Sequence, residues 1–123
     1  MEENPIRWFE IYVQDMERAK AFYATLFDYQ FKSLDTPDAE MWAFPDVMGK
    51  YGAGGALIKM DGVPPGGGGT LVYFGTDDCS GPESRVEQAG GRVVKPKMSI
   101  GPHGFISLVE DTEGNVIGLH SMK

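Results

Sequence analysis

A carboxylate stands in the middle of an otherwise apolar stretch near the start of the chain. The stretch RWFEIYV, residues 7–13, has the aromatic and branched residues typical of a β-strand, with Glu10 at its centre. Because side chains alternate between the two faces of a strand, Glu10 shares a face with Trp8 and Tyr12. A carboxylate among aromatic rings can accept a proton or bind a donor of a small molecule. Glu10 is therefore a candidate catalytic residue, and Trp8 and Tyr12 are candidate ligand contacts.

An imidazole takes a similar place near the end of the chain. In the last predicted strand, Gly118 and His120 alternate with an apolar pair, so they lie on the opposite face from that pair. In an earlier strand, Leu71 and Tyr73 alternate with apolar residues in the same way. His120 and Tyr73 are further candidate catalytic residues, and Leu71 and Gly118 are candidate ligand contacts. The structural alternative stays open: Glu10 could be a sheet-edge residue that reaches water, or the ion-pair partner of an arginine or of His120.

Two more side chains are candidates for the same ligand site. Trp42 lies in MWAFP, a predicted middle strand, where it would form either a wall of the site or part of the core. His103 lies in the glycine-flanked loop SIGPHGF, where it would either border the site or be an ordinary solvated loop residue.

The elements that position these residues occur twice along the chain. Asp15 follows the first strand as the N-cap of a helix at residues 16–27, because its carboxylate can accept from free amides of the first turn. Three short strands follow, and after an offset of 63 residues, from Asp15 to Asp78, the order recurs. In the second half, Ser80 and Glu83 match a capping box before a short helix at 83–89. The remaining strands are predicted at 29–34, 41–45, 54–60, 70–78, 92–100, 104–111 and 115–122.

This repeat predicts an α+β fold of two βαβββ modules in one domain. Module 1 covers residues of about 5–60, a Pro- and Gly-rich linker covers about 61–69, and module 2 covers about 70–123. A sheet with one helix on one face needs its other face covered. Two such mixed half-sheets side by side, with their helices outside, would enclose a concave cleft. The faces of Glu10 and His120 are expected to line that cleft.

The composition limits which classes of partner the protein can bind and in which cell compartment it is expected. The 123 residues are 41% hydrophobic and 24% charged, as expected for one compact globular domain. The formal charge of −7 argues against a nucleic-acid partner. No apolar run approaches the roughly 20 residues that span a bilayer, so no membrane partner is expected. A single cysteine and no basic, apolar leader favour a cytoplasmic protein.

Two stretches resemble a known family. EIYVQDMERAKAFYATLFDYQF is similar to the opening of the vicinal oxygen chelate superfamily, which includes glyoxalase I, bleomycin-resistance proteins and extradiol dioxygenases. GPHGFISLVEDTEGNVIGLHS is similar to the family's closing segment, in which a D-x-x-G-N turn leads into the last strand. The chain most resembles small glyoxalase-like proteins related to lactoylglutathione lyase. The resemblance implies a homodimer, since members often dimerise, sometimes by exchanging modules.

The resemblance also implies a divalent metal, held by His, Glu or Gln side chains from the first and last strands of each module. Trp8, Leu71 and Gly118 stand at three of those positions here, and none of them can bind a metal through its side chain. Glu10 and His120, each two residues further along, are weak candidates for a displaced metal site, with Tyr73 as a third group. Two good ligands rarely hold a transition metal tightly, so a metal-free site is favoured.

Three functions follow from these expectations. The favoured one is a metal-free protein that binds a small organic molecule in an aromatic-lined cleft, as drug-binding members of the family do. The second is a glyoxalase-like lyase or isomerase in which Glu10 is base or ligand, His120 is ligand or acid, and Tyr73 is an oxyanion donor. The third is a non-catalytic interaction subunit.

Overall fold

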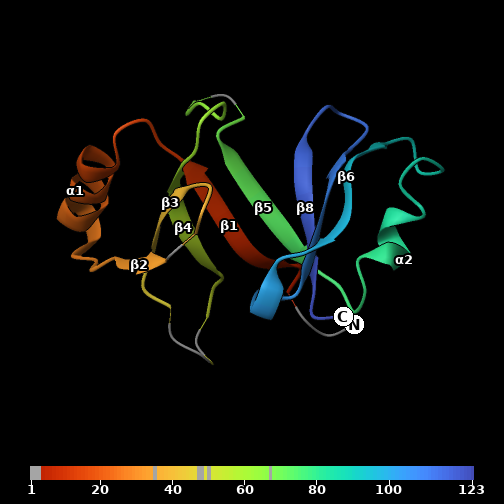
Figure 1. Ribbon diagram of the computed structural model, residues 1–123, viewed down its shortest axis with the longest axis horizontal. Helices are drawn as coiled ribbons and strands as arrows, with labels where there is room; N and C mark the ends of the chain where they lie inside the picture. Colours follow the sequence, from red (N-terminus) through yellow and green to blue (C-terminus); the bar gives the residue numbers. More distant parts are fainter. Residues whose placement is uncertain (1–3, 35, 47–48, 50, 67) are drawn as a thin grey trace. The chain divides into compact units, whose positions relative to one another are not determined.

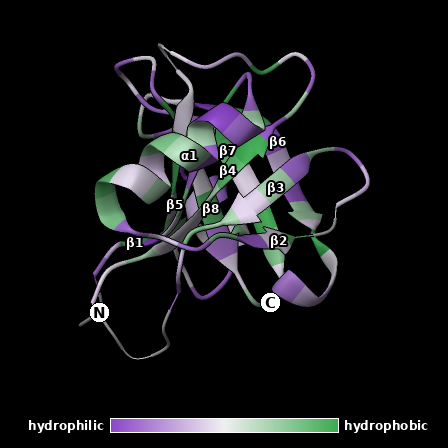
Figure 2. Cartoon of the chain, turned by 90° about the vertical axis from the view of Figure 1, so that its left-hand side faces the viewer, coloured by the Kyte–Doolittle hydropathy of each residue, from purple (hydrophilic) through white to green (hydrophobic). Residues whose placement is uncertain are grey.

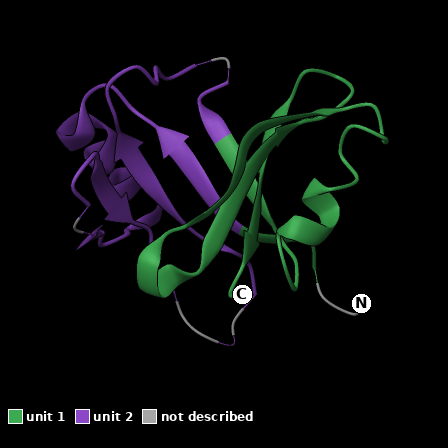
Figure 3. Cartoon of the chain, turned by 45° about the vertical axis from the view of Figure 1, so that its right-hand side comes forward, with its two compact units in different colours: residues 1–7, 71–123 green, residues 8–70 purple. Residues whose placement is uncertain are grey.

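The computed structural model describes residues 4–34, 36–46, 49, 51–66 and 68–123. The chain divides into two compact units, which Figure 3 shows in different colours. Unit 2 is residues 8–70, and unit 1 combines residues 1–7 with residues 71–123. In the described part of the chain, no helix is long and apolar enough to cross a membrane.

Unit 2 contains a four-stranded sheet with one helix against it (Figures 1 and 2). The strand order is β2-β3-β4-β1, with β1 and β4 parallel and the other pairs antiparallel. Its elements are β1 (Ile6–Tyr12), α1 (Met16–Phe27), β2 (Lys32–Leu34), β3 (Glu40–Ala43) and β4 (Gly54–Lys59), the first two residues of β1 belonging to unit 1. Phe9 and Ile11 of β1 pack towards α1 in a core around Met16, Phe44 and Leu57. Strand alternation therefore leaves Trp8, Glu10 and Tyr12 on the other face of β1.

The predicted bounds of α1 are confirmed, and both ends have a local cause. At the start, Asp15 Oδ1 accepts a hydrogen bond of 3.0 Å from the backbone N–H of Arg18. At the end, Asp28 adopts the left-handed conformation with φ 60° and donates its N–H to Ala24 O at 2.7 Å.

The last turn of α1 differs from expectation. The helical spacing predicts that Leu26 and Phe27 pack on the sheet, but their exposed fractions are 52% and 54%. The reason is that Tyr29 and Phe31, from the segment after the helix, pack their rings around Phe44 and fill that end of the core.

Unit 1 has the same plan with a shorter helix (Figure 1). The strand order is β5-β8-β7-β6, with β5 and β8 parallel and the other pairs antiparallel. Its elements are β5 (Thr70–Gly75, of which Thr70 lies in unit 2), α2 (Ser80–Glu83), β6 (Arg92–Ser99), the 3-10 turn η1 (Gly101–His103), β7 (Phe105–Glu110) and β8 (Val116–Ser121). Cys79, Val109 and Leu119 form its buried core, with Phe74 against them.

The prediction for the second helix is wrong in two respects. Residues 84–90 form turns rather than a helix, since most of their backbone hydrogen bonds join residues three apart. Ser80 and Glu83 do not form a capping box. The Glu83 carboxylate instead accepts from Lys97 N–H at 2.7 Å and from Ser107 O–H at 2.8 Å, which ties α2 to β6 and β7.

The α+β class and the order of elements in both halves are confirmed. The described residues form eight strands in a mixed arrangement, with one α-helix in each unit. The cleft expected between the modules stays a prediction.

Candidate functional site

The candidate site in unit 2 is built around the Glu10 carboxylate. Trp8 donates its indole Nε1–H to Glu10 Oε2 at 3.3 Å, and Tyr12 donates its O–H to Glu10 Oε1 at 2.7 Å. The three side chains are half-buried and share one face of β1, as strand alternation predicts. Both carboxylate oxygens are therefore oriented by donors from their own strand. We call Trp8, Glu10 and Tyr12 the Glu10 cluster.

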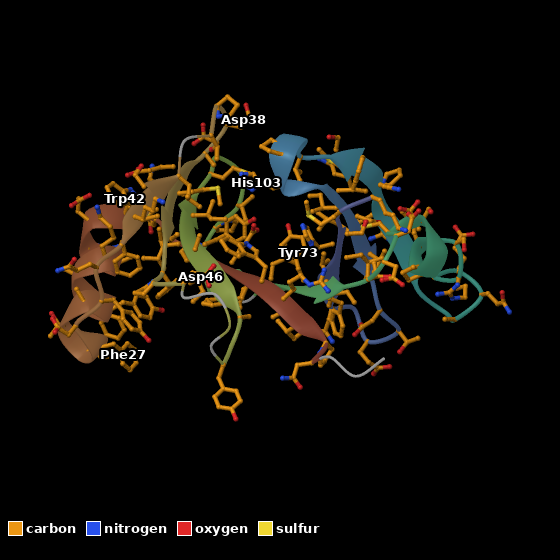
Figure 4. All side chains as sticks on the ribbon, turned by 90° about the horizontal axis from the view of Figure 1, so that it is seen from below. Phe27, Asp38, Trp42, Asp46, Tyr73 and His103 are labelled. Atoms are coloured by element: carbon orange, nitrogen blue, oxygen red, sulfur yellow. The ribbon has the colours of Figure 1, made fainter. Side chains whose placement is uncertain are left out.

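Small residues of β4 lie beside the Glu10 cluster on the same face. Gly54 is in register with Trp8, and Ala56 is in register with Glu10. A Cβ at Gly54 would lie 2.9 Å from Oδ2 of Asp46 and 3.3 Å from Cζ3 of Trp8. Asp46 is labelled beside β1 and β4 in Figure 4. The sequence gives no sign of this second carboxylate, because Asp46 follows a proline in a loop, where no periodic pattern assigns it a face.

Trp42 does not belong to the Glu10 cluster. It is in register with Leu57, whose side chain is in the core on the α1 side of the sheet. Lys20 of α1 places its Nζ 3.3 Å from the centre of the Trp42 ring, and Figure 4 shows Trp42 beside α1. Of the two roles that the sequence left open for Trp42, its packing favours the core.

In unit 1, Tyr73 and Gly118 lie on adjacent strands in register. A Cβ at Gly118 would clash with the Tyr73 ring, so this ring lies over the glycine, and Tyr73 is buried. The resemblance places a metal-binding Glu at this position. In this chain a glycine is required there because an aromatic ring of the neighbouring strand fills the space. Leu71, at the start of β5, is half-buried.

His120 is held by a backbone carbonyl. Its Nε2 lies 2.7 Å from the carbonyl oxygen of His103 in η1, so Nε2 is the ring nitrogen that donates. Among the described residues, the buried Nδ1 has no hydrogen-bond partner. His103 therefore orients His120 through its backbone, while its own side chain is exposed. This contact fixes the tautomer and the ring orientation of His120.

Arg7 is a charged residue of unit 1 that the sequence pattern does not single out. A Cβ at Gly75 would clash with the guanidinium group of Arg7, so this group lies over Gly75. Gly75 is in register with His120. The glycine inside the strand was a signal that another side chain passes close to the backbone there. Nothing in the sequence indicates which side chain that is.

The structure thus assembles two groups of candidate residues. Trp8, Glu10 and Tyr12 come together in unit 2. In unit 1, Tyr73 lies over Gly118, and His120 bonds to the backbone of His103.

The residues present do not fit the divalent metal that the resemblance implies. Among the described residues, no three or more His, Cys, Asp or Glu side chains are grouped so that they could hold a metal ion. Trp8, Leu71 and Gly118 occupy positions implied for ligands, and the Tyr73 ring covers one of them. The two weak candidates also have other contacts, since Glu10 accepts from Trp8 and Tyr12 and His120 bonds to His103.

Comparison with known proteins decides the family. The model of the Glyoxalase/Bleomycin resistance protein/Dioxygenase superfamily matches residues 6–119. The chain belongs to this superfamily. Its β-α-β-β-β order in both halves agrees with the glyoxalase fold of its structural neighbours. A similar solved structure is that of methylmalonyl-CoA epimerase from Mycobacterium tuberculosis, with a TM-score of 0.69 and 15% identity, covering 97% of this chain and 88% of that one. At this identity the likeness shows the fold alone.

Two relatives of this chain are much longer than it is. The "Putative glyoxylase CFP32" of Mycobacterium bovis is 28% identical over 118 residues, covering 91% of this chain but 43% of that protein. The "Anthracycline biosynthesis protein DnrV" of Streptomyces peucetius is 29% identical and is likewise covered over 43% of its length. The chain thus spans less than half of these two relatives. A "Glyoxylase-like domain-containing protein" of Didymella fabae is 29% identical, with 86% of this chain and 84% of that protein covered.

Proposed function

We propose that this glyoxalase-superfamily protein binds a small organic molecule at the Glu10 cluster and needs no metal to do so. The observation that carries the proposal is the Glu10 carboxylate, oriented at 3.3 Å and 2.7 Å by Trp8 and Tyr12 on a half-buried face. A ligand with an N–H or O–H donor and a flat apolar part would bond to Glu10 and stack on Trp8. The name of the relative DnrV, which refers to anthracycline biosynthesis, supports polycyclic aromatic compounds as the first to test.

The two tryptophans of the chain allow a direct test. Trp8 lies in the Glu10 cluster and Trp42 lies on the opposite face of the same sheet, so each serves as a control for the other. In the Trp42→Phe variant, the remaining fluorescence of Trp8 should be quenched saturably by an anthracycline such as daunomycin. In the Trp8→Phe variant, the fluorescence of Trp42 should change little.

Substitution of the carboxylate tests the binding role. Glu10→Gln keeps the shape of the side chain but removes its charge, so a donor on the ligand loses a charge-assisted hydrogen bond worth about 1.5–3 kcal/mol. The dissociation constant should rise by about tenfold or more. Equal quenching of Trp8 and Trp42, or an unchanged dissociation constant in Glu10→Gln, would contradict a ligand site at this cluster.

A second candidate is an enzyme that moves a proton next to a carbonyl group. The observation that favours it is the Glu10 carboxylate, each of whose oxygens is oriented by a donor from its own strand. Glu10 would be the base of a lyase or isomerase reaction. The test is exchange of the α-proton of methylmalonyl-CoA in D₂O, followed by NMR. Exchange that disappears in Glu10→Gln would support the enzyme, and no exchange above the buffer rate would contradict this use of the substrate.

A further inference from the structure

Unit 2 has a cavity on the side of the sheet that faces α1. It has a volume of about 460 Å³, which lies in the range of small-molecule pockets. The α1 cavity, as we call it, is bounded by α1, by the end of β1 and the segment after it, and by Pro65 and Gly66. Its lining includes Ile11 and Val13, which alternate with the Glu10 cluster and so lie on the opposite face. Tyr12 of the Glu10 cluster also lines the cavity, whereas Trp8 and Glu10 do not, so the cavity adjoins the site of the proposed function.

The walls of the α1 cavity are largely apolar and aromatic. Phe22 is 55% exposed, although it is one of the largest apolar side chains of the helix. Its ring meets the Tyr23 ring edge to face, with centres 5.1 Å apart and planes at 90°. A flat apolar molecule placed against Phe22 would remove this ring from water and add an aromatic contact. Ala19 and Pro65 provide further apolar surface.

The α1 cavity also has a cationic group. Arg18 lines it, and its side chain is 73% exposed. Its charge partner is Asp15, which also lines the cavity and whose Oδ2 lies 4.0 Å from Arg18 Nη1, too far for a hydrogen bond. Asp15 uses its other oxygen to cap α1. This exposed pair holds Arg18 weakly, so the guanidinium can present two parallel N–H groups to a carboxylate or a sulfonate.

We propose that the α1 cavity binds a flat aromatic anion, with its ring against Phe22 and its anionic group on Arg18. The chemical class is an aromatic carboxylate or sulfonate, which combines both required features. The two anchors, Phe22 and Arg18, lie outside the Glu10 cluster, and Glu10 itself does not line the cavity, so substitution of Glu10 distinguishes the two sites.

The fluorescent probe 1-anilinonaphthalene-8-sulfonate is an aromatic anion and allows a titration of the full chain. Phe22→Ser and Arg18→Gln should each weaken binding of the probe by about tenfold, because each removes one of the two anchors. Leu26→Ser is the matched control: Leu26 lies on the same helix and is 52% exposed, but it does not line the cavity. Leu26→Ser should leave the dissociation constant within about twofold of the wild-type value.

A neutral analogue separates the two anchors. N-phenyl-1-naphthylamine lacks the sulfonate, so Arg18→Gln should not change its binding, whereas Phe22→Ser should still weaken it. Near-ultraviolet circular dichroism checks that each variant is folded, and a chemical-shift perturbation map locates the bound probe on wild-type protein.

Four outcomes would overturn the proposal. The first is probe binding that Phe22→Ser and Arg18→Gln leave unchanged. The second is an equal loss in Leu26→Ser, which would indicate a general apolar surface or contact with a second copy of the chain. The third is a loss in Glu10→Gln, which would assign the probe to the Glu10 cluster. The fourth is a set of shifted resonances outside α1, the end of β1 and residues 65–66.

Discussion

At two strand positions a glycine leaves room for a side chain from another strand of the fold. The Tyr73 ring lies over Gly118, and the Arg7 guanidinium lies over Gly75. Neither glycine is there for a turn. Each leaves the space that a Cβ would occupy, and so both are packing residues of the His120 face.

This packing makes Gly118→Ala a severe change. The added Cβ would clash with the Tyr73 ring, and overpacking of this kind costs about 1–3 kcal/mol of the free energy of unfolding. Gly81→Ala is the control, because a Cβ there would meet only Arg85, at 4.0 Å. Urea unfolding of both variants should give a lower midpoint for Gly118→Ala alone. Equal midpoints would mean that the Tyr73 ring does not occupy this space.

At the scale of elements, substitutions at the two ends of α1 are expected to change the free energy of unfolding in opposite directions. Asp15→Ala removes the N-cap and should lower the free energy of unfolding by about 1 kcal/mol. Asp28→Gly places glycine at a left-handed residue and should raise it by up to about 1 kcal/mol. Thermal unfolding of the two variants measures both effects. If Asp15→Ala stabilised the protein, the helix would begin at another residue in solution. If Asp28→Gly destabilised it, the helix would end at another residue.

The contacts that tie α2 to β6 predict a dependence of stability on pH. Lys97 Nζ lies 2.8 Å from Asp78 Oδ1, and this hydrogen bond, with those from Ser80, holds the pKa of Asp78 well below its ordinary value. A carboxyl group with a lowered pKa in the folded state stabilises the protein above its unfolded pKa, about 3.9. We therefore expect this contribution at neutral pH and its progressive loss as the pH falls below about 4.

The variant Asp78→Asn tests this dependence. It should be less stable than wild type at pH 7, and the difference should shrink between about pH 4 and pH 2, where wild type also loses the charge. Asp77→Asn removes the same charge one residue away from the Lys97 bond and is the control. The Asp111 carboxyl also has a lowered pKa, caused mainly by hydrogen bonds from Asn115, so Asp111→Asn should reduce the acid sensitivity separately. A constant difference between Asp78→Asn and wild type across this range would contradict the assignment.

For the whole molecule, the arrangement of donor side chains predicts low metal content. Elemental analysis of the purified protein should give well below one divalent metal ion per chain. Chelator treatment should leave the melting temperature and the quenching of Trp8 unchanged. A stoichiometric metal that is lost both in Glu10→Gln and in His120→Ala would establish a displaced metal site instead.

The number of chains that associate in solution is a further property of the whole molecule, and the lengths of its relatives bear on it. CFP32 and DnrV are more than twice as long as the part of them that this chain matches. We expect this chain to form a homodimer, as the resemblance to the superfamily implies. Light scattering after size exclusion should give twice the mass of 13.5 kDa. A monomer at micromolar concentration would contradict this expectation.

The features that the sequence predicted correctly depend on neighbours in the chain. Asp15 and the helical pattern after it place α1, since capping and helical hydrogen bonds span only three or four residues. Alternation along β1 predicts that Trp8, Glu10 and Tyr12 share a face, because the period of a strand is two. The family resemblance likewise rests on short stretches, and the match over residues 6–119 confirms it.

The features that only the tertiary structure decided depend on residues far apart in the chain. The Glu83 side chain bonds to β6 and β7 instead of capping α2, because its partners lie 14 and 24 residues away. Trp42 faces α1 because the register of β3 with β4 pairs it with Leu57. Tyr29 and Phe31, not Leu26, fill the core around Phe44. Local patterns establish which face a residue can occupy, but the competition among distant side chains for the same space decides which of them occupies it.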